Sequence, residues 1–212
     1  MDKSAIPLTA NFKPYNYRLA LQAAREKLAA GTPAKMANNS GCVFDNNCFK
    51  VICLNHTFTV SYPTGLVTYQ ESQLQPPMPL QLIMLNYLSR SDGTPLTYNF
   101  IPYRDLDGGN AFYDAFFRTA ITPITNHFGR QPELLIKAAQ PFGGVPFTQS
   151  TGTAVLLYLL PRVPLLYQLW PGDEEIPSQA NILFDRSANH YLHTEDLATD
   201  YVSRLLIEQS QK

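Results

Sequence analysis

Apolar residues recur along the chain with two different spacings, one typical of helices and one typical of strands. Between residues 14 and 30 they recur among charged residues at helical spacing, and Gly31 follows, which predicts an amphipathic helix at the start of the fold. Three shorter runs rich in Phe, Val, Ile and Thr predict a β-meander. These runs are residues 48–55, 57–62 and 66–69.

The remaining chain predicts three more strands and four more helices. The strands are expected at residues 96–103, 153–160 and 165–170. The helices are expected from Pro79 to a stop at residues 91–93, from residues 107–110 onward with a kink at Pro123, over residues 132–140, and after an N-cap at Thr194. Residues 153–160 show no alternation, so this strand is expected to be buried on both faces.

Together these elements predict an α+β fold with mainly antiparallel sheets and about five helices. In the helix that contains Pro123, four apolar residues recur at fourfold spacing and are expected to face the core: Phe112, Phe116, Ala120 and Ile124. No linker or low-complexity segment separates two halves of the sequence. Residues 1–212 are therefore expected to form a single domain.

Composition narrows the class of partner. Hydrophobic residues make up 45% of the chain and charged residues only 16%, against about 25% in typical soluble domains, so the surface is weakly charged and suits contact. The net charge is -1 and the cations are scattered, so no nucleic-acid partner is expected. The longest apolar stretch, residues 154–166, is interrupted by Pro161, Arg162 and Pro164, and no membrane span is expected. No secretory signal is evident, and we expect a cytoplasmic location.

Three cysteines and a histidine lie close together in the sequence. Cys42, Cys48, Cys53 and His56 suggest a zinc or iron–sulfur site, but no Cys-x2-Cys pair is present. Cys48 and Cys53 are five residues apart in one predicted strand, which places them on opposite faces. We therefore expect free thiols that act as small core residues in a reducing compartment, with no bound metal or other cofactor.

An acidic run follows the end of a predicted strand. Asp173, Glu174 and Glu175 come directly after Trp170-Pro171-Gly172, and together with Asp185 they could bind a hard cation or supply a general base. Adjacent carboxylates in a loop are more often simply solvated. Trp170, the only tryptophan, could be buried at the strand end or exposed in a recognition surface.

Other polar groups leave similar alternatives. Arg104 could clamp a carboxylate or phosphate, or form a salt bridge with Asp105 or Asp107. His190 and His193 could hold a transition metal with Glu195, or lie at the surface. Two glycine pairs fit turns and match no phosphate-binding pattern, and no serine lies in a nucleophile elbow.

Several blocks of the sequence resemble a prokaryotic family of unknown function, over most of the chain. They are residues 101–106 with Gly108-Gly109, residues 160–165, 170–175, 182–185, 191–192 and 195–196. The resemblance implies a source in anaerobic bacteria or archaea, where some members are joined to a four-cysteine iron–sulfur segment like those of corrinoid proteins. That segment is not found in this sequence. An association with corrinoid or iron–sulfur proteins is implied by the resemblance, and no activity is.

The sequence favours a non-catalytic binding or accessory module that contacts a protein partner or a small-molecule ligand. The alternative is an enzyme that acts on a small anionic substrate through the acidic loop and Arg104, with a divalent metal. A metalloprotein built on the cysteines ranks last. The residues expected to line the functional surface are Arg104, Trp170, Asp173, Glu174 and Asp185.

Overall fold

The computed structural model describes residues 14–148, 152–173, 175–198 and 200–212. Contacts between Cα atoms divide the chain into two compact units, and each is described by itself. Unit 1 contains the chain up to Pro95, together with Leu160–Arg162 and His190–Leu192. Unit 2 contains Leu96–Leu159, Val163–Asn189 and His193–Lys212. Both units combine helices with an antiparallel sheet, so the predicted α+β class is confirmed.

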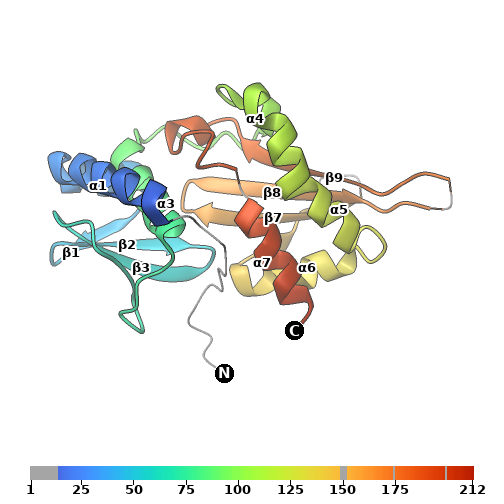
Figure 1. Cartoon of the computed structure of the whole chain (residues 1–212), viewed down its shortest axis with the longest axis horizontal. Helices are drawn as coiled ribbons and strands as arrows, with labels where there is room; N and C mark the ends of the chain where they lie inside the picture. Colours follow the sequence, from blue (N-terminus) through green and yellow to red (C-terminus); the bar gives the residue numbers. More distant parts are fainter. Residues whose placement is uncertain (1–13, 149–151, 174, 199) are drawn as a thin grey trace. The chain divides into compact units, whose positions relative to one another are not determined.

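Over its described residues, unit 1 consists of a four-stranded antiparallel meander and three α-helices. Its helices are α1 (Pro14–Ala30), α2 (Pro33–Ser40) and α3 (Met78–Arg90). Its strands are β1 (Val43–Asp45), β2 (Cys48–Cys53), β3 (His56–Ser61) and β4 (Val67–Tyr69), in the order β1-β2-β3-β4. Helices α1 and α3 lie across one face of this sheet (Figure 1). The predicted first helix, meander and second helix are confirmed.

Two elements of unit 1 were not predicted. Helix α2 is short, begins with Pro33 and ends at Gly41, which has a φ of 70° that glycine adopts without strain. Strand β1 has only three residues and pairs with β2. Both elements are too short to produce a clear periodicity in the sequence.

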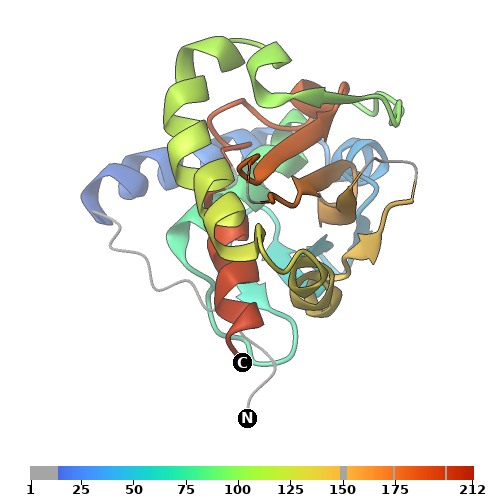
Figure 2. The same cartoon turned by 90° about the vertical axis from the view of Figure 1, so that its right-hand side faces the viewer.

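Unit 2 is built on a five-stranded sheet. Its strands are β5 (Phe100–Pro102), β6 (Val145–Pro146), β7 (Thr153–Leu160), β8 (Val163–Trp170) and β9 (Gln179–Asp185), in the order β5-β9-β8-β7-β6. Its α-helices are α4 (Gly109–Phe116), α5 (Thr122–Phe128), α6 (Glu133–Ala139) and α7 (Asp200–Ser210). Shorter helical turns are η1 (Tyr103–Asp105), η2 (Phe117–Ile121) and η3 (Gln140–Phe142). Helices α4, α5 and α7 lie on one side of the strands (Figures 1 and 2).

Helices α4 and α5 are joined by η2, which is a turn of π-helix. Pro123 follows this turn, and proline cannot donate a backbone hydrogen bond and clashes with the preceding turn of an α-helix. The wider turn places the backbone N–H of Thr122 against the carbonyl of Phe117. The sequence predicts a kink at Pro123, and the structure shows a π-helical turn that ends two residues before it. Phe116, Ala120 and Ile124 are buried as predicted, whereas Phe112 is 44% exposed.

Three further segments of unit 2 differ from what the sequence predicts. The strand expected at residues 96–103 covers only Phe100–Pro102, because residues 97 and 98 turn to bind a carboxylate described below. Strand β9 was not predicted, since its first half is Gln-Ala-Asn and has little strand character. Thr194 does not cap a helix: its hydroxyl donates to the carbonyl of Asp107 at 2.6 Å, and α7 begins only at Asp200.

The covered face of the unit 2 sheet holds an aromatic core. The rings of Tyr103 and Phe116 stack with centroids 4.0 Å apart. Phe184 of β9 lies 5.8 Å from Tyr103 and 5.9 Å from Phe116. All three rings are almost completely buried, so this cluster anchors η1 and α4 to the sheet.

Candidate functional site

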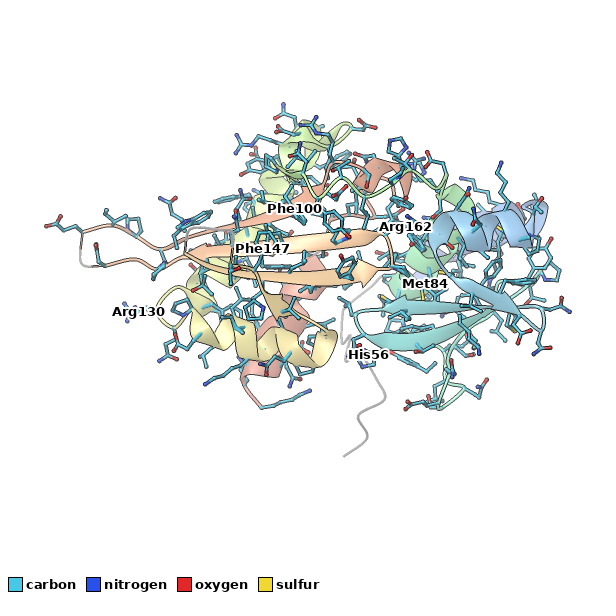
Figure 3. The ribbon with its side chains drawn as sticks, turned by 180° about the vertical axis from the view of Figure 1, so that it is seen from behind. His56, Met84, Phe100, Arg130, Phe147 and Arg162 are labelled. Carbon is cyan, nitrogen blue, oxygen red and sulfur yellow. The ribbon has the colours of Figure 1, made fainter. Side chains whose placement is uncertain are left out.

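The unit 2 sheet is strongly curved, and one ring contact shows it. Strands β5 and β6 are the two edges of the sheet, so four strand spacings of about 4.8 Å would separate them by about 19 Å if it were flat. Phe100 lies in β5 and Phe147 directly follows β6, yet their ring centroids are only 6.0 Å apart. Two side chains cannot bridge a flat sheet of that width. The sheet therefore curls toward the face that carries these two rings (Figure 3).

The register identifies the other side chains on this face. Leu183 pairs with both Pro102 of β5 and Leu166 of β8, which alternates with Gln168 and Trp170. On the other side, Leu156 pairs with Val145, which alternates with Phe147. We call this surface the aromatic face. Its members are Tyr98, Phe100, Phe147, Leu156, Tyr158, Leu166, Gln168, Trp170, Asn181 and Leu183, with the buried Asp185 opposite Phe100.

The aromatic face is partly accessible, unlike the helix-covered face. In β7, Val155, Leu157 and Leu159 are fully buried, whereas Leu156 and Tyr158 between them are half-buried. The expectation that residues 153–160 are buried on both faces therefore holds only for one face. The rings of Phe100 and Phe147 and the indole of Trp170 are also half-buried.

Two kinds of polar group lie on the aromatic face. The hydroxyls of Tyr98 and Tyr158 are hydrogen bonded to each other. Burial, followed by this hydrogen bond, raises the pKa of Tyr158 to about 12, so the group stays neutral and can donate. The amides of Gln168 and Asn181 stand opposite each other across β8 and β9. The face thus combines aromatic rings with uncharged groups that donate and accept.

Asp185, predicted to line the functional surface, is completely buried. Its Oδ1 accepts hydrogen bonds from the backbone and hydroxyl of Thr97 and of Ser187, at 2.6 to 3.2 Å. Its Oδ2 accepts one from the backbone N–H of Tyr98 at 2.5 Å. Burial acts to raise the pKa of this carboxyl, but the bonds from Ser187 and Thr97 outweigh it and lower the pKa. Asp185 therefore holds the segment that carries Tyr98.

Trp170 and the acidic run lie at the other end of β8. Trp170 is on the aromatic face, where its indole packs close to Gly152, a position at which a β-carbon would lie 3.0 Å from the ring. Asp173 is fully exposed, and its Oδ1 accepts the backbone N–H groups of Ile176 and Glu175 at 2.7 and 2.9 Å. These bonds lower its pKa and form a local turn. Glu174 lies outside the described residues.

Arg104 is exposed in η1, on a different element from the aromatic face. Its guanidinium lies over the ring of Tyr113, 4.3 Å from the centroid, which is a cation–π contact. In the part of the chain that the structure describes, no ion pair joins it to Asp105 or Asp107, and no hydrogen bond joins it to Asp173, Asp185 or Trp170. Arg104 and the acidic loop therefore do not share contacts among the described residues.

The cysteines and histidines of unit 1 have other partners. Cys48 and Cys53 point to opposite faces of β2, as predicted. Burial raises the pKa of the thiols of Cys42 and Cys53 to about 11 and about 12, so both stay protonated at neutral pH. His190 binds Asp92 through Nδ1 at 2.6 Å. Over residues 14–148, 152–173, 175–198 and 200–212, no three His, Cys, Asp or Glu side chains are grouped as a metal site would require.

A hydroxyl beside His190 invites comparison with a catalytic triad. Thr94 lies 3.1 Å from Nδ1 of the imidazole, but the Asp92 carboxylate lies on that same nitrogen. A triad needs the hydroxyl and the carboxylate on different nitrogens, so that one orients the ring while the other loses its proton. The Asp92, His190 and Thr94 group is therefore a structural tie between two segments of unit 1.

Comparison with known proteins identifies a family. Residues 32–204 match the family described as "Domain of unknown function (DUF3786)". The chain belongs to this family. No curated protein and no solved structure gives a significant match. The expected membership in an uncharacterised family is confirmed, while its restriction to anaerobic prokaryotes and its link to iron–sulfur segments stay predictions.

The DUF3786 match spans parts of both units, and it includes the whole aromatic face. None of the described helices is long and apolar enough to pass through a lipid bilayer. Sequence reasoning had found two residues of this region, Trp170 and Asp185. It missed the ring pair and the tyrosine pair, although Tyr158 stands out as the one aromatic residue in a strand that is aliphatic from Ala154 onward.

Proposed function

We propose that this DUF3786 protein is a non-catalytic binding module whose aromatic face holds a small uncharged ligand. The contact between Phe100 and Phe147 carries the proposal, because it shows that the sheet curves around this face. Curved, mostly apolar surfaces with a few convergent polar groups are the usual form of small-molecule sites. The tyrosine hydroxyls and the paired amides supply those polar groups.

The charge of the face indicates the charge of the ligand. Asp185, which stands opposite Phe100, is the one Lys, Arg, Asp or Glu side chain that the register places among the described residues of the aromatic face. It is completely buried, and its carboxylate is saturated by hydrogen bonds from Thr97, Tyr98 and Ser187, so it is not available to a ligand. A charged ligand placed here would lose hydration without gaining a counter-charge, which is costly. An uncharged ligand with an apolar side avoids that cost.

Intrinsic fluorescence provides a direct test, because Trp170 lies on the aromatic face and is the only tryptophan. The protein is titrated with uncharged trisaccharides, nucleosides and cyclic dipeptides. We expect one class to change the emission of Trp170 and to bind at least tenfold more weakly to Phe147→Ala. Phe117→Ala is the matched control, since Phe117 is 45% exposed on η2, away from the face. Equal affinity of both variants, or no binding by any class, would contradict the proposal.

An enzyme that acts on a small anionic substrate is the second candidate. The exposed guanidinium of Arg104, stacked on Tyr113, favours it, because such an arginine can receive an anion. Inorganic phosphate and malonate serve as probes, with and without Mg²⁺ or Mn²⁺, in calorimetric titrations of the protein and of Arg104→Ala. Saturable binding that Arg104→Ala abolishes would support this candidate, and its absence would remove it.

The family resemblance supports a further part of the proposal, an association with corrinoid or iron–sulfur proteins. Described cysteines that are free rather than paired support a cytoplasmic location. A net charge of -1 argues against a nucleic-acid partner. Anaerobic co-purification of the tagged chain, followed by cobalt and iron analysis, tests the association. Metal at the background of an unrelated tagged protein would count against it.

A further inference from the structure

Tyr98 has an unfavourable backbone conformation and a large exposed side chain. Its φ is 52°, in the left-handed region that side chains with a β-carbon rarely adopt. It is also 61% exposed, so its ring contributes little to a core. A bulky residue at such a position destabilises the fold relative to glycine, and strained residues of this kind cluster at functional sites.

Other described residues with positive φ have simpler explanations. Three are asparagines, which tolerate this conformation in tight turns: Asn46, Asn47 and Asn55. Leu54 is completely buried, so packing offsets its strain. Gln73 is exposed in a turn, where its backbone N–H donates to the carbonyl of Tyr69 and its side-chain amide donates to the carbonyl of Gln70, both at 3.0 Å. Among the described non-glycine residues with positive φ, Tyr98 is thus the one exposed aromatic residue.

The fold holds Tyr98 in place with an unusual concentration of hydrogen bonds. The Asp185 carboxylate receives the backbone N–H of Tyr98 on Oδ2, while Oδ1 receives four donors from Thr97 and Ser187. A carboxylate with this many donors fixes the segment firmly. The hydroxyl of Tyr98 is then presented to Tyr158 on the aromatic face.

The groups around Tyr98 define the chemistry of a ligand. The half-buried rings of Phe100 and Phe147 favour an apolar surface on one side of the ligand, and partial exposure leaves its other side in water. Tyrosine hydroxyls and side-chain amides both donate and accept, so they match groups that do the same. A sugar ring has this combination, since its C–H face is apolar and its hydroxyls donate and accept. A proline-rich peptide would offer the amides few donors.

We propose that Tyr98 is a recognition residue for a neutral saccharide on the aromatic face, and that Asp185 is the positioning residue that holds it there. This inference rests on the proposed binding function and names its ligand class. Tyr98 stacks against or hydrogen bonds to the sugar, while Asp185 does not touch it. The strained backbone of Tyr98 fixes its ring in the binding orientation before the ligand binds, which lowers the entropy cost of binding.

Substitution of Tyr98 by glycine separates binding from folding. Glycine adopts the same backbone conformation freely, so Tyr98→Gly is expected to melt within about 2 °C of the parent chain. The same variant is expected to lose at least tenfold in affinity for maltotriose, cellotriose or chitotriose, measured by the emission of Trp170. Gln73→Gly is the matched control, because it makes the same backbone change at an exposed strained residue of unit 1. It should leave saccharide affinity unchanged.

Asp185→Asn tests the positioning role. Asparagine retains one oxygen for Thr97 and Ser187 but turns an NH₂ group toward the N–H of Tyr98. We expect faster hydrogen exchange at the Tyr98 amide and weaker saccharide binding. Thr97→Val, which removes one hydroxyl donor and keeps the Tyr98 bond, should preserve most of the affinity. If Asp185→Asn does not fold, Thr97→Val and Tyr98→Gly still provide the comparison.

The outcomes distinguish this inference from the proposed function. Unchanged saccharide binding by Tyr98→Gly would overturn the role of Tyr98. Binding of nucleosides or cyclic dipeptides, but of no saccharide, in a manner sensitive to Phe147→Ala would overturn the ligand class and leave the binding function standing. A loss of more than about 5 °C in the melting temperature of Tyr98→Gly would show that the residue serves the fold instead.

Discussion

The two sheets of this chain differ in the face that lies opposite their helices. In unit 1 that face carries polar side chains such as Lys50, Thr59 and Ser61, and Thr59 and Thr68 hydrogen bond across β3 and β4 at 2.8 Å. In unit 2 the corresponding face is the aromatic face. Both sheets are antiparallel, so strand direction does not account for the difference.

The difference teaches what each face is suited to contact. Strand β2 alternates strictly between buried and accessible residues, which is typical of an antiparallel sheet with one face in water. Strands β7 and β8 are mostly apolar on both sides, yet four of their five partly accessible residues lie on the aromatic face: Leu156, Tyr158, Gln168 and Trp170. Partly accessible apolar surface of this kind is typical of binding sites rather than of solvated faces.

The largest expected loss of stability comes from a comparison of the two faces of the unit 2 sheet. Phe184→Ala removes a buried ring that touches Tyr103 and Phe116, and should lower the free energy of unfolding by about 3–5 kcal/mol. Phe100→Ala on the aromatic face should cost less than about 2 kcal/mol, because that ring is only half-buried. Urea denaturation of both variants measures the difference. Similar losses would show that the aromatic face is an ordinary core.

The next largest loss of stability is expected where a buried tyrosine hydroxyl makes two hydrogen bonds inside unit 1. The hydroxyl of Tyr87 donates to the carbonyl of Ser40 at 2.5 Å and accepts the backbone N–H of Arg162 at 3.1 Å. Tyr87→Phe leaves both groups without this partner and should cost about 1–3 kcal/mol of unfolding free energy. Tyr113→Phe is the control, as that hydroxyl has no described hydrogen bond. Equal stabilities would mean that water replaces the hydroxyl at no cost.

How far the sequence could predict this structure depends on the element. Strand β7 was predicted with its observed bounds, because Thr153 is followed by seven apolar residues and then at once by Pro161 and Arg162. Helix α3 was predicted within one residue at its start, from Pro79 and the stop at Ser91. The sequence did not predict strand β9. Two of its first three residues, Gln179 and Asn181, are polar and face the partly accessible side of the sheet, so they give no strand-like hydrophobic pattern.

The candidate site was harder to predict than the fold, for a physical reason. The aromatic face combines residues from position 98 to position 183, and only the order β5-β9-β8-β7-β6 brings them together. Strand order is set by tertiary packing, which no local periodicity reveals. Trp170 could be selected because it ends a strand beside a loop. Tyr98 could not, because its left-handed conformation is imposed by Asp185, which is 87 residues away in the chain.

A smaller effect tests the surface polar contacts of unit 1 through pH. Burial acts to raise the pKa of Asp92, but hydrogen bonds from His190 and Thr94 outweigh it and hold the pKa at about 2. A carboxyl whose pKa is depressed by folding stabilises the fold at higher pH, and this contribution disappears as the pH falls through the range from about 4 to 2. The pair is half-exposed, so Asp92→Asn should cost only about 0.2–1 kcal/mol at pH 7.

Urea denaturation of Asp92→Asn and the parent chain at pH 7, 4 and 2 measures this dependence. The difference in unfolding free energy should shrink toward zero at pH 2. Asp114→Asn is the control, because Asp114 lies exposed on α4 and has no ion pair among the described residues. A difference that stays constant with pH would mean that the carboxylate of Asp92 is not the stabilising group.

The smallest expected effect returns to the faces opposite the helices. Ile52 is 54% exposed and stands opposite Thr57 on the polar face of unit 1, so Ile52→Thr should change the free energy of unfolding by less than about 0.5 kcal/mol. Threonine retains the β-branched shape that suits a strand, and it can hydrogen bond to the facing threonine. Leu183→Thr on the aromatic face removes apolar area from a half-buried surface and should cost about 1 kcal/mol. If Leu183→Thr were as neutral as Ile52→Thr, the aromatic face would tolerate polar side chains as a solvated surface does, and the contrast between the two sheets would lose its functional meaning.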